Sequence, residues 1–184
     1  MRSRKLRESA APVLTGSLVC LVPEQRQLLL RMTTPFPGTS ELRDLNTRPP
    51  RSPGERLGGY AILARCLDKG RAELSGAAGA YHFGCRLDHM LFEFKGVTGE
   101  DILKLLRDRA TDPEVVKWLN SHGITRTPDE VAAWSAVMDG IRPADDPEHR
   151  EWFIAECHRL DLDPAQTTLF ACLDEDDRHL PVTA

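Results

Sequence analysis

Three features that would point to common protein classes are scarce in the 184-residue chain or missing from it. Aromatic side chains make up only 6% of it, which argues against a base-stacking sheet and a β-sandwich core. There is no apolar run of about 18 residues, so no transmembrane helix is predicted. No Cys-x-x-Cys pair occurs, and the five cysteines are widely spaced. We therefore expect reduced thiols in a cytoplasmic protein.

Charge is unevenly distributed along the chain. The first 31 residues carry +4, and the whole chain carries −4, so the remainder is acidic at −8. Because an acidic body is repelled by phosphate backbones, we expect no nucleic-acid partner, and no membrane partner either. We predict a disordered N-terminal extension over residues 1–41, a single domain over residues 42–177 and a tail over residues 178–184.

Proline marks the predicted helix starts. It fits the first helical position because the N–H that it lacks would be unpaired there. Two of the starts extend to capping boxes, Ser52 with Glu55 and Thr127 with Glu130. A capping residue precedes proline five times: Ser52-Pro53, Asp112-Pro113, Thr127-Pro128, Asp146-Pro147 and Asp163-Pro164.

These signals predict an all-α fold, a compact irregular bundle of about six or seven short helices. Apolar spacing places a central helix at residues 53–74. Only residues 13–22 and 28–30 are candidates for strands. The other predicted helices cover residues 87–94, a segment after Thr98, and residues 113–121, 128–139, 147–160 and 164–172.

An ordered set of short motifs runs through residues 42–177. The set consists of Asp44-Leu45, Arg48-Pro49-Pro50-Arg51-Ser52-Pro53, Leu57-Gly58-Gly59-Tyr60, Leu67-Asp68-Lys69 with Arg71-Ala72, Tyr81 with Cys85-x-Leu87-Asp88, Ala133-Trp134, Glu151-Trp152-Phe153, and Phe170-x-x-Leu173-Asp174-x-Asp176-Asp177. In these motifs the chain resembles the bacterial family known as domain of unknown function 5069. The resemblance implies a small cytosolic helical domain and no established activity. Arg86 departs from it, because the family usually has proline there.

Charged residues on the apolar face of the central helix suggest a polar site. Arg71 falls on that face, and Asp68 lies one turn away. A buried charge must be paired or must meet a ligand. The pair is therefore either a structural lock or part of a pocket in which Arg71, with Arg65 or Lys69, holds an anionic small molecule.

The basic segment before the central helix suggests a second anion site. Arg51 stands beside the expected helix start at Pro53, where free N–H groups attract anions. The alternative is a capped helix in which Glu55 already satisfies these groups. No Gly-Lys-Ser/Thr sequence is present, so a phosphate-binding P-loop is not predicted.

Cys85 is the candidate nucleophile. It comes just before the expected helix at residues 87–94, where a helix start favours the thiolate, and His82 and Asp88 lie close in sequence. The alternative is a packed turn in which Cys85 is buried and Asp88 caps the helix. His82, Cys85 and His89 have loose metal-ligand spacing, but no further pair completes a tetrahedral set, so we predict neither metal nor cofactor.

Two functions remain open. In the first, the protein binds a small anionic ligand, with or without catalysis by Cys85 and Asp88. The expected ligand-binding residues are Arg51, Arg65, Asp68, Lys69, Arg71, Tyr81 and His82. In the second, the protein is a non-catalytic interaction or scaffold domain with a structural network of buried ion pairs. We assign the remaining histidines to surface or capping positions, the tryptophans to the core and the acidic run 174–177 to a solvated tail.

Overall fold

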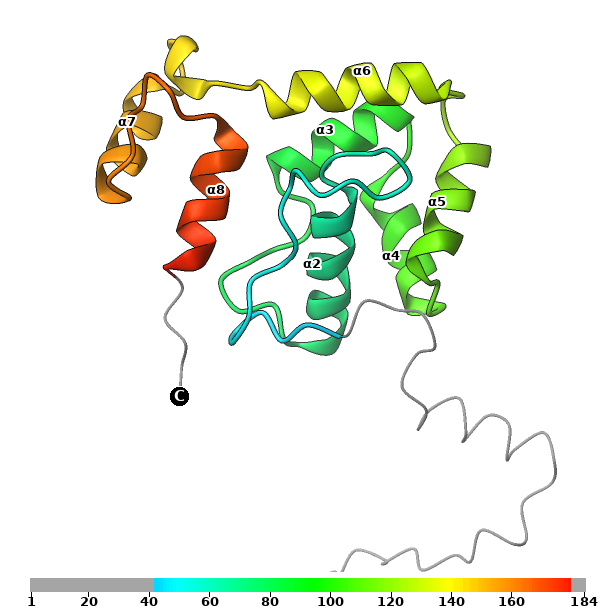
Figure 1. Ribbon diagram of the computed structural model, residues 1–184. Helices are drawn as coiled ribbons and strands as arrows, with labels where there is room; N and C mark the ends of the chain where they lie inside the picture. The colour runs from blue at the N-terminus through cyan, green and yellow to red at the C-terminus, as the bar shows by residue number, and fades with distance from the viewer. Residues whose placement is uncertain (1–41, 180–184) are drawn as a thin grey trace, which may run out of the picture. The chain divides into compact units, whose positions relative to one another are not determined.

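The computed structural model describes residues 42–179, which fold into α-helices joined by loops (Figure 1). This range contains no strand and a single bridge between Leu57 and Tyr60, so the all-α prediction is confirmed. The predicted extension and the candidate strands at 13–22 and 28–30 lie outside the described residues. The seven α-helices and one short 3-10 helix of this range are α2 (Leu63–Ser75), α3 (Arg86–Lys95), α4 (Gly99–Arg107), α5 (Asp112–Ser121), α6 (Pro128–Asp139), η2 (Pro143–Asp145), α7 (Arg150–Arg159) and α8 (Leu169–Arg178).

Three of the helices begin with a reciprocal capping box. The pairs are Thr98 with Asp101 in α4, Thr111 with Glu114 in α5, and Thr127 with Glu130 in α6. The box predicted at Thr127 is thus confirmed, and α6 has the predicted bounds. Helix α5 is capped by Thr111 rather than by Asp112, because the Asp112 carboxylate binds arginine side chains instead.

Helix α2 begins at Leu63, ten residues later than the predicted start at Pro53. The intervening residues Gly58, Gly59 and Ile62 have φ angles of 62°, 89° and 69°. A right-handed helix cannot continue through such left-handed conformations. The segment before α2 is therefore a series of turns.

The capping box predicted at Ser52 and Glu55 is wrong. The Ser52 hydroxyl accepts a hydrogen bond from the Gly54 N–H at 3.1 Å and donates one to the Asp174 carboxylate of α8 at 2.8 Å. Ser52 therefore ties the turns before α2 to the last helix of the described chain.

The starts predicted for the last two helices are also wrong. Helix α7 begins at Arg150 and α8 at Leu169, three and five residues after the predicted prolines. Asp146 and Asp163 each accept a hydrogen bond from the backbone N–H two residues further on. An aspartate before proline therefore makes a tight turn at both places, and the helix forms afterwards.

Helix α2 is the centre of the main apolar core. Residues 61–70 are all buried, and α2 packs against both α3 and α4. A Cβ atom at Gly70 would lie 2.6 Å from Leu106 Cδ1 of α4, so glycine permits this close crossing. The polar residues of α2 consequently have little access to water except where a cavity reaches them.

A second, smaller apolar cluster joins α7 to α8. Its buried residues are Phe153, Cys157, Leu160 and Cys172. Burial raises the pKa of the Cys157 thiol, and it raises that of Cys172 to about 12, so both remain protonated. All four cysteines of the described chain, these two with Cys66 and Cys85, are free thiols. No helix of residues 42–179 is long and apolar enough to cross a membrane.

Candidate functional site

Asp68 and Arg71 belong to a network of six charged side chains, in which Arg43 lies 3.4 Å from Asp68 and Glu55 lies 3.7 Å from Arg51. Asp68, whose side chain is 1% exposed, binds the Arg51 guanidinium at 2.8 Å. Arg51 also binds Asp112 at 2.8 Å, and Asp112 binds Arg71 at 2.7 Å. The expected pairing is therefore built through two further residues, and charges alternate along the network.

This network offers Arg51 little opportunity to meet a ligand. Its guanidinium also donates to the Ala64 carbonyl at 3.1 Å, and its backbone N–H donates to Asp68 at 2.9 Å. Buried carboxylates need such partners because their desolvation is costly. The arrangement therefore fits the structural interpretation of Asp68 and Arg71 that the sequence left open.

We expect Asp112 to make the stability of the fold depend on pH. Burial raises the pKa of its carboxyl group. Arg71 and Arg51 lower that pKa by more than burial raises it, so the net pKa lies below the ordinary value of 3.8. The folded state therefore binds fewer protons than the unfolded state, and this stabilisation is lost as the pH falls through the folded pKa.

Urea denaturation at a series of pH values tests this expectation. The difference in unfolding free energy between the wild type and Asp112→Asn should be largest above about pH 5 and should narrow below about pH 4. A difference that stays constant through the acid range would show that the Asp112 charge does not contribute. Glu93→Gln, at an exposed position of α3, controls for general acid effects.

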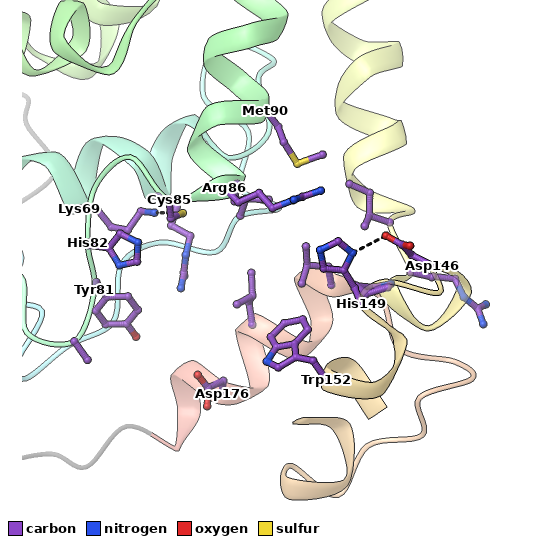
Figure 2. A pocket seen from close by; sticks show the side chains of 18 residues that line it. Lys69, Tyr81, His82, Cys85, Arg86, Met90, Asp146, His149, Trp152 and Asp176 are labelled. Atoms are coloured by element: carbon purple, nitrogen blue, oxygen red, sulfur yellow. Dashed lines mark hydrogen bonds and ion pairs between the residues drawn. The ribbon is translucent and has the colours of Figure 1, made fainter. Parts of the chain in front are cut away.

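A cavity of about 750 Å³ lies beside α2 (Figure 2). Its walls come from α2, the loop between α2 and α3, α3, the connection from α6 to η2, α7 and α8. Figure 2 shows Lys69, His82 and Cys85 on one side and His149 and Trp152 on the other. Most of the lining is apolar, and the larger apolar side chains are Leu87, Met90, Ile141, Trp152, Leu169 and Leu173.

The predicted site residues divide into two groups. Five of the nine line the cavity: Arg65, Lys69, Tyr81, His82 and Cys85. Asp88 contacts Lys69. Arg51, Asp68 and Arg71 belong to the ion-pair network described above. The structure thus brings the candidate nucleophile and four of the expected ligand-binding residues to one cavity.

Lys69 connects Cys85 to a buried carboxylate. Its Nζ atom lies 3.0 Å from Cys85 Sγ and 2.8 Å from Asp88 Oδ2. Burial lowers the pKa of Lys69, but the Asp88 carboxylate and Cys85 more than offset this, and the net pKa is raised. Lys69 is therefore an ammonium group at neutral pH.

A second ionic contact closes the cavity near α8. Arg65 binds Asp177 at 2.6 Å, and the Tyr81 hydroxyl donates to the same carboxylate at 2.6 Å. Burial and this hydrogen bond raise the pKa of Tyr81, so its phenol stays protonated. The acidic run 174–177 is thus not merely a solvated tail, since Asp174 binds Ser52 and Asp177 binds two side chains.

The sequence prediction missed the far wall of the cavity. Trp152 was expected in the core, but 53% of its surface is exposed, and it lines the cavity. His149 was expected at a surface or capping position; it is the N-cap residue of α7, but it also lines the cavity and contacts Asp146 at 2.6 Å. The only available signal was the motif Glu151-Trp152-Phe153, which carried part of the family resemblance.

No group of three or more histidine, cysteine or acidic side chains in residues 42–179 is arranged to hold a metal ion. No curated protein matches the chain. The family described as Domain of unknown function (DUF5069) matches residues 47–179, which include every residue that lines the cavity. This match spans well over half of the 184 residues, and the chain therefore belongs to that family.

Proposed function

We propose that the cavity beside α2 binds a small anionic molecule with an apolar body. The observation that carries the proposal is the cavity itself, whose volume of about 750 Å³ lies within the usual range for small-molecule sites. Its apolar lining would bury the body of the ligand. Its few polar groups would orient one end.

Arg86 is the best candidate to meet the negative charge. The ammonium of Lys69 and the guanidinium of Arg65 already face Asp88 and Asp177. Arg86, at the start of α3, lines the cavity, and it forms no ion pair with a described residue, although its charge helps to lower the pKa of Asp146. A charged hydrogen bond from Arg86 to a ligand would therefore sacrifice no existing pair.

The scaffold alternative draws support from a different part of the molecule. The network of Arg51, Asp68, Asp112 and Arg71 is satisfied internally, as a structural ion-pair network should be. That observation identifies no surface for a protein partner. We therefore favour the ligand-binding function, in a cytoplasmic protein whose acidic body disfavours nucleic acid.

Calorimetric titration with sodium hexanoate, octanoate and decanoate tests the binding proposal. Each added CH₂ should tighten binding by up to about fourfold, since burial of one contributes about 0.8 kcal/mol. Octanoate should bind better than 1-octanol and octyltrimethylammonium, because the site prefers negative charge. No saturable binding of any carboxylate at millimolar concentration would contradict the proposal.

Matched variants locate the binding. Arg86→Gln should weaken octanoate about tenfold and leave octanol unchanged, because only the charged contact is lost. Trp152→Ala should weaken both ligands, because it removes apolar wall. Arg107→Gln is the control, since Arg107 pairs with Glu100 at an exposed position and does not line the cavity.

A further inference from the structure

We propose that Cys85 is the nucleophile of an acyl-transfer reaction, and that the substrate is an ester or thioester with an apolar acyl chain and a negatively charged leaving half. This inference rests on the proposed ligand-binding function of the cavity. It adds a reaction, a substrate class and roles for three residues. Three features support it: the accessibility of Cys85, its contacts with Lys69 and Asp88, and the start of α3 beside it.

Cys85 is the accessible thiol of the described chain. It is partly exposed and lines the cavity, whereas Cys66, Cys157 and Cys172 are buried. Burial also raises the pKa of the Cys66 thiol well above its ordinary value, which keeps that sulfur inert. A small electrophile in the cavity would therefore meet Cys85.

The contacts of Cys85 have the arrangement of an activated nucleophile. The Lys69 ammonium donates to Sγ at 3.0 Å, and Asp88 holds the ammonium at 2.8 Å. The Lys69 side chain is only 4% exposed and that of Asp88 is fully buried, so the geometry is fixed by packing. The Lys69 ammonium cannot accept the thiol proton, so its role is to stabilise negative charge on Sγ, while Asp88 orients it.

Asp88 also fixes the turn that carries the nucleophile. Its Oδ2 atom accepts the Gly84 N–H at 2.9 Å as well as the Lys69 ammonium. Gly84 has a φ of 75° and directly precedes Cys85. Asp88 is therefore a positioning residue, because it acts through Lys69 and through the backbone.

The start of α3 supplies donors for a developing oxyanion. Cys85 is the N-cap of α3, and its side chain does not cap the first-turn N–H groups. The backbone N–H groups of Arg86 and Leu87 have no acceptor within the helix. The helix dipole adds partial positive charge at this end of α3. Such donors beside the nucleophile favour attack on a carbonyl, because negative charge develops on the carbonyl oxygen.

The reaction balances without an oxidant or a metal. The Cys85 sulfur forms a bond to the carbonyl carbon, and the bond from that carbon to the leaving oxygen or sulfur breaks. The leaving group departs as an anion or takes up the proton that the thiol gave to water or His82, which lines the same side of the cavity (Figure 2). Water or an amine then accepts the acyl group and regenerates the thiol.

Reaction with 4-nitrophenyl acetate, butyrate and octanoate tests the proposal. In a Cys20→Ser background, one equivalent of nitrophenolate should be released rapidly, and mass spectrometry should place the acyl group on the peptide containing Cys85. The rate constant should rise about tenfold or more from acetate to octanoate, because the longer chain is buried in the cavity. Cys85→Ser should abolish the burst.

The role of Lys69 requires a readout that simple packing would not change. Lys69→Gln should slow acylation about tenfold or more, and Lys69→Arg, which retains the positive charge, should slow it much less. Circular dichroism on each variant confirms the fold. An equal loss for Lys69→Gln and Lys69→Arg would contradict a charge role for Lys69.

Binding of unreactive octanoate to Cys85→Ser separates the two proposals. If octanoate binds and no ester acylates Cys85 in the wild type, the acyl-transfer proposal is wrong and the binding function stands. If octanoate does not bind, the proposed ligand-binding function is wrong, and the acyl-transfer proposal that rests on it is wrong as well. Acylation that is independent of chain length would reduce Cys85 to an exposed thiol and overturn the substrate class.

Discussion

Replacing Arg51 by methionine should destabilise the fold by about 3–5 kcal/mol, since two buried carboxylates lose a charged partner. Asp68 then keeps Arg43 at 3.4 Å, and Asp112 keeps Arg71 at 2.7 Å. Arg51 binds Asp68 and Asp112, and both carboxylates are almost inaccessible to water. Methionine would retain much of the apolar volume, so the loss reports mainly on charge. Urea denaturation followed by circular dichroism measures the difference.

Arg107→Met is the matched control for Arg51→Met. Arg107 pairs with Glu100, and both side chains are largely exposed, so the loss should be at most about 1 kcal/mol. The double variant Arg51→Met with Asp112→Asn should be more stable than the sum of the single losses implies, because both substitutions remove the same Arg51–Asp112 ion pair. Equal losses for Arg51→Met and Arg107→Met would show that the network does not stabilise the fold.

Gly123→Ala should be nearly as damaging, with a loss of about 3 kcal/mol or more, because it combines backbone strain with overpacking. Gly123 has a φ of 67°, and an added Cβ would lie 2.1 Å from the Lys95 carbonyl oxygen. That carbonyl is held in place by the Ile124 N–H at 2.6 Å. The clash therefore falls on backbone that cannot easily move.

Gly76→Ala separates the two contributions. Gly76 has a φ of 72°, but nothing lies within 4 Å of an added Cβ. Its loss should be about 1 kcal/mol, the strain of a left-handed residue alone. Thermal and urea denaturation measure the loss of stability in both variants. The difference between the two losses is the cost of the clash between the added Cβ and the Lys95 carbonyl oxygen. Similar losses would mean that the loop at Gly123 relaxes.

Local sequence signals predicted a helix start correctly where the capping residues bind their own helix rather than a distant residue. The Thr127-Pro128 start with Glu130 gave the bounds of α6, because the capping box needs no distant partner. Ser52-Pro53 carries the same local pattern, yet Ser52 binds Asp174, which is 122 residues away. A distant contact of that kind leaves no local trace, so the start of α2 was misplaced.

The same distinction applies to the site. Five predicted residues that line the cavity, from Arg65 to Cys85, are close in sequence and come from α2 and the loop after it. The opposite wall comes from the connection after α6, from α7 and from α8. His149 and Trp152 therefore reach the cavity through tertiary packing, and composition or spacing could not have placed them there.

Leu45 determines where an autonomous folding unit must begin. It is 2% exposed, and its N–H donates to the Ala77 carbonyl just after α2 at 2.9 Å. Gly79 lies so close that an added Cβ would approach the Leu45 carbonyl oxygen to 2.9 Å. The family match starts two residues downstream of Leu45. A chain truncated to begin at residue 47 would lose the buried Leu45 side chain and its hydrogen bond to Ala77. A cavity would then remain beside the end of α2.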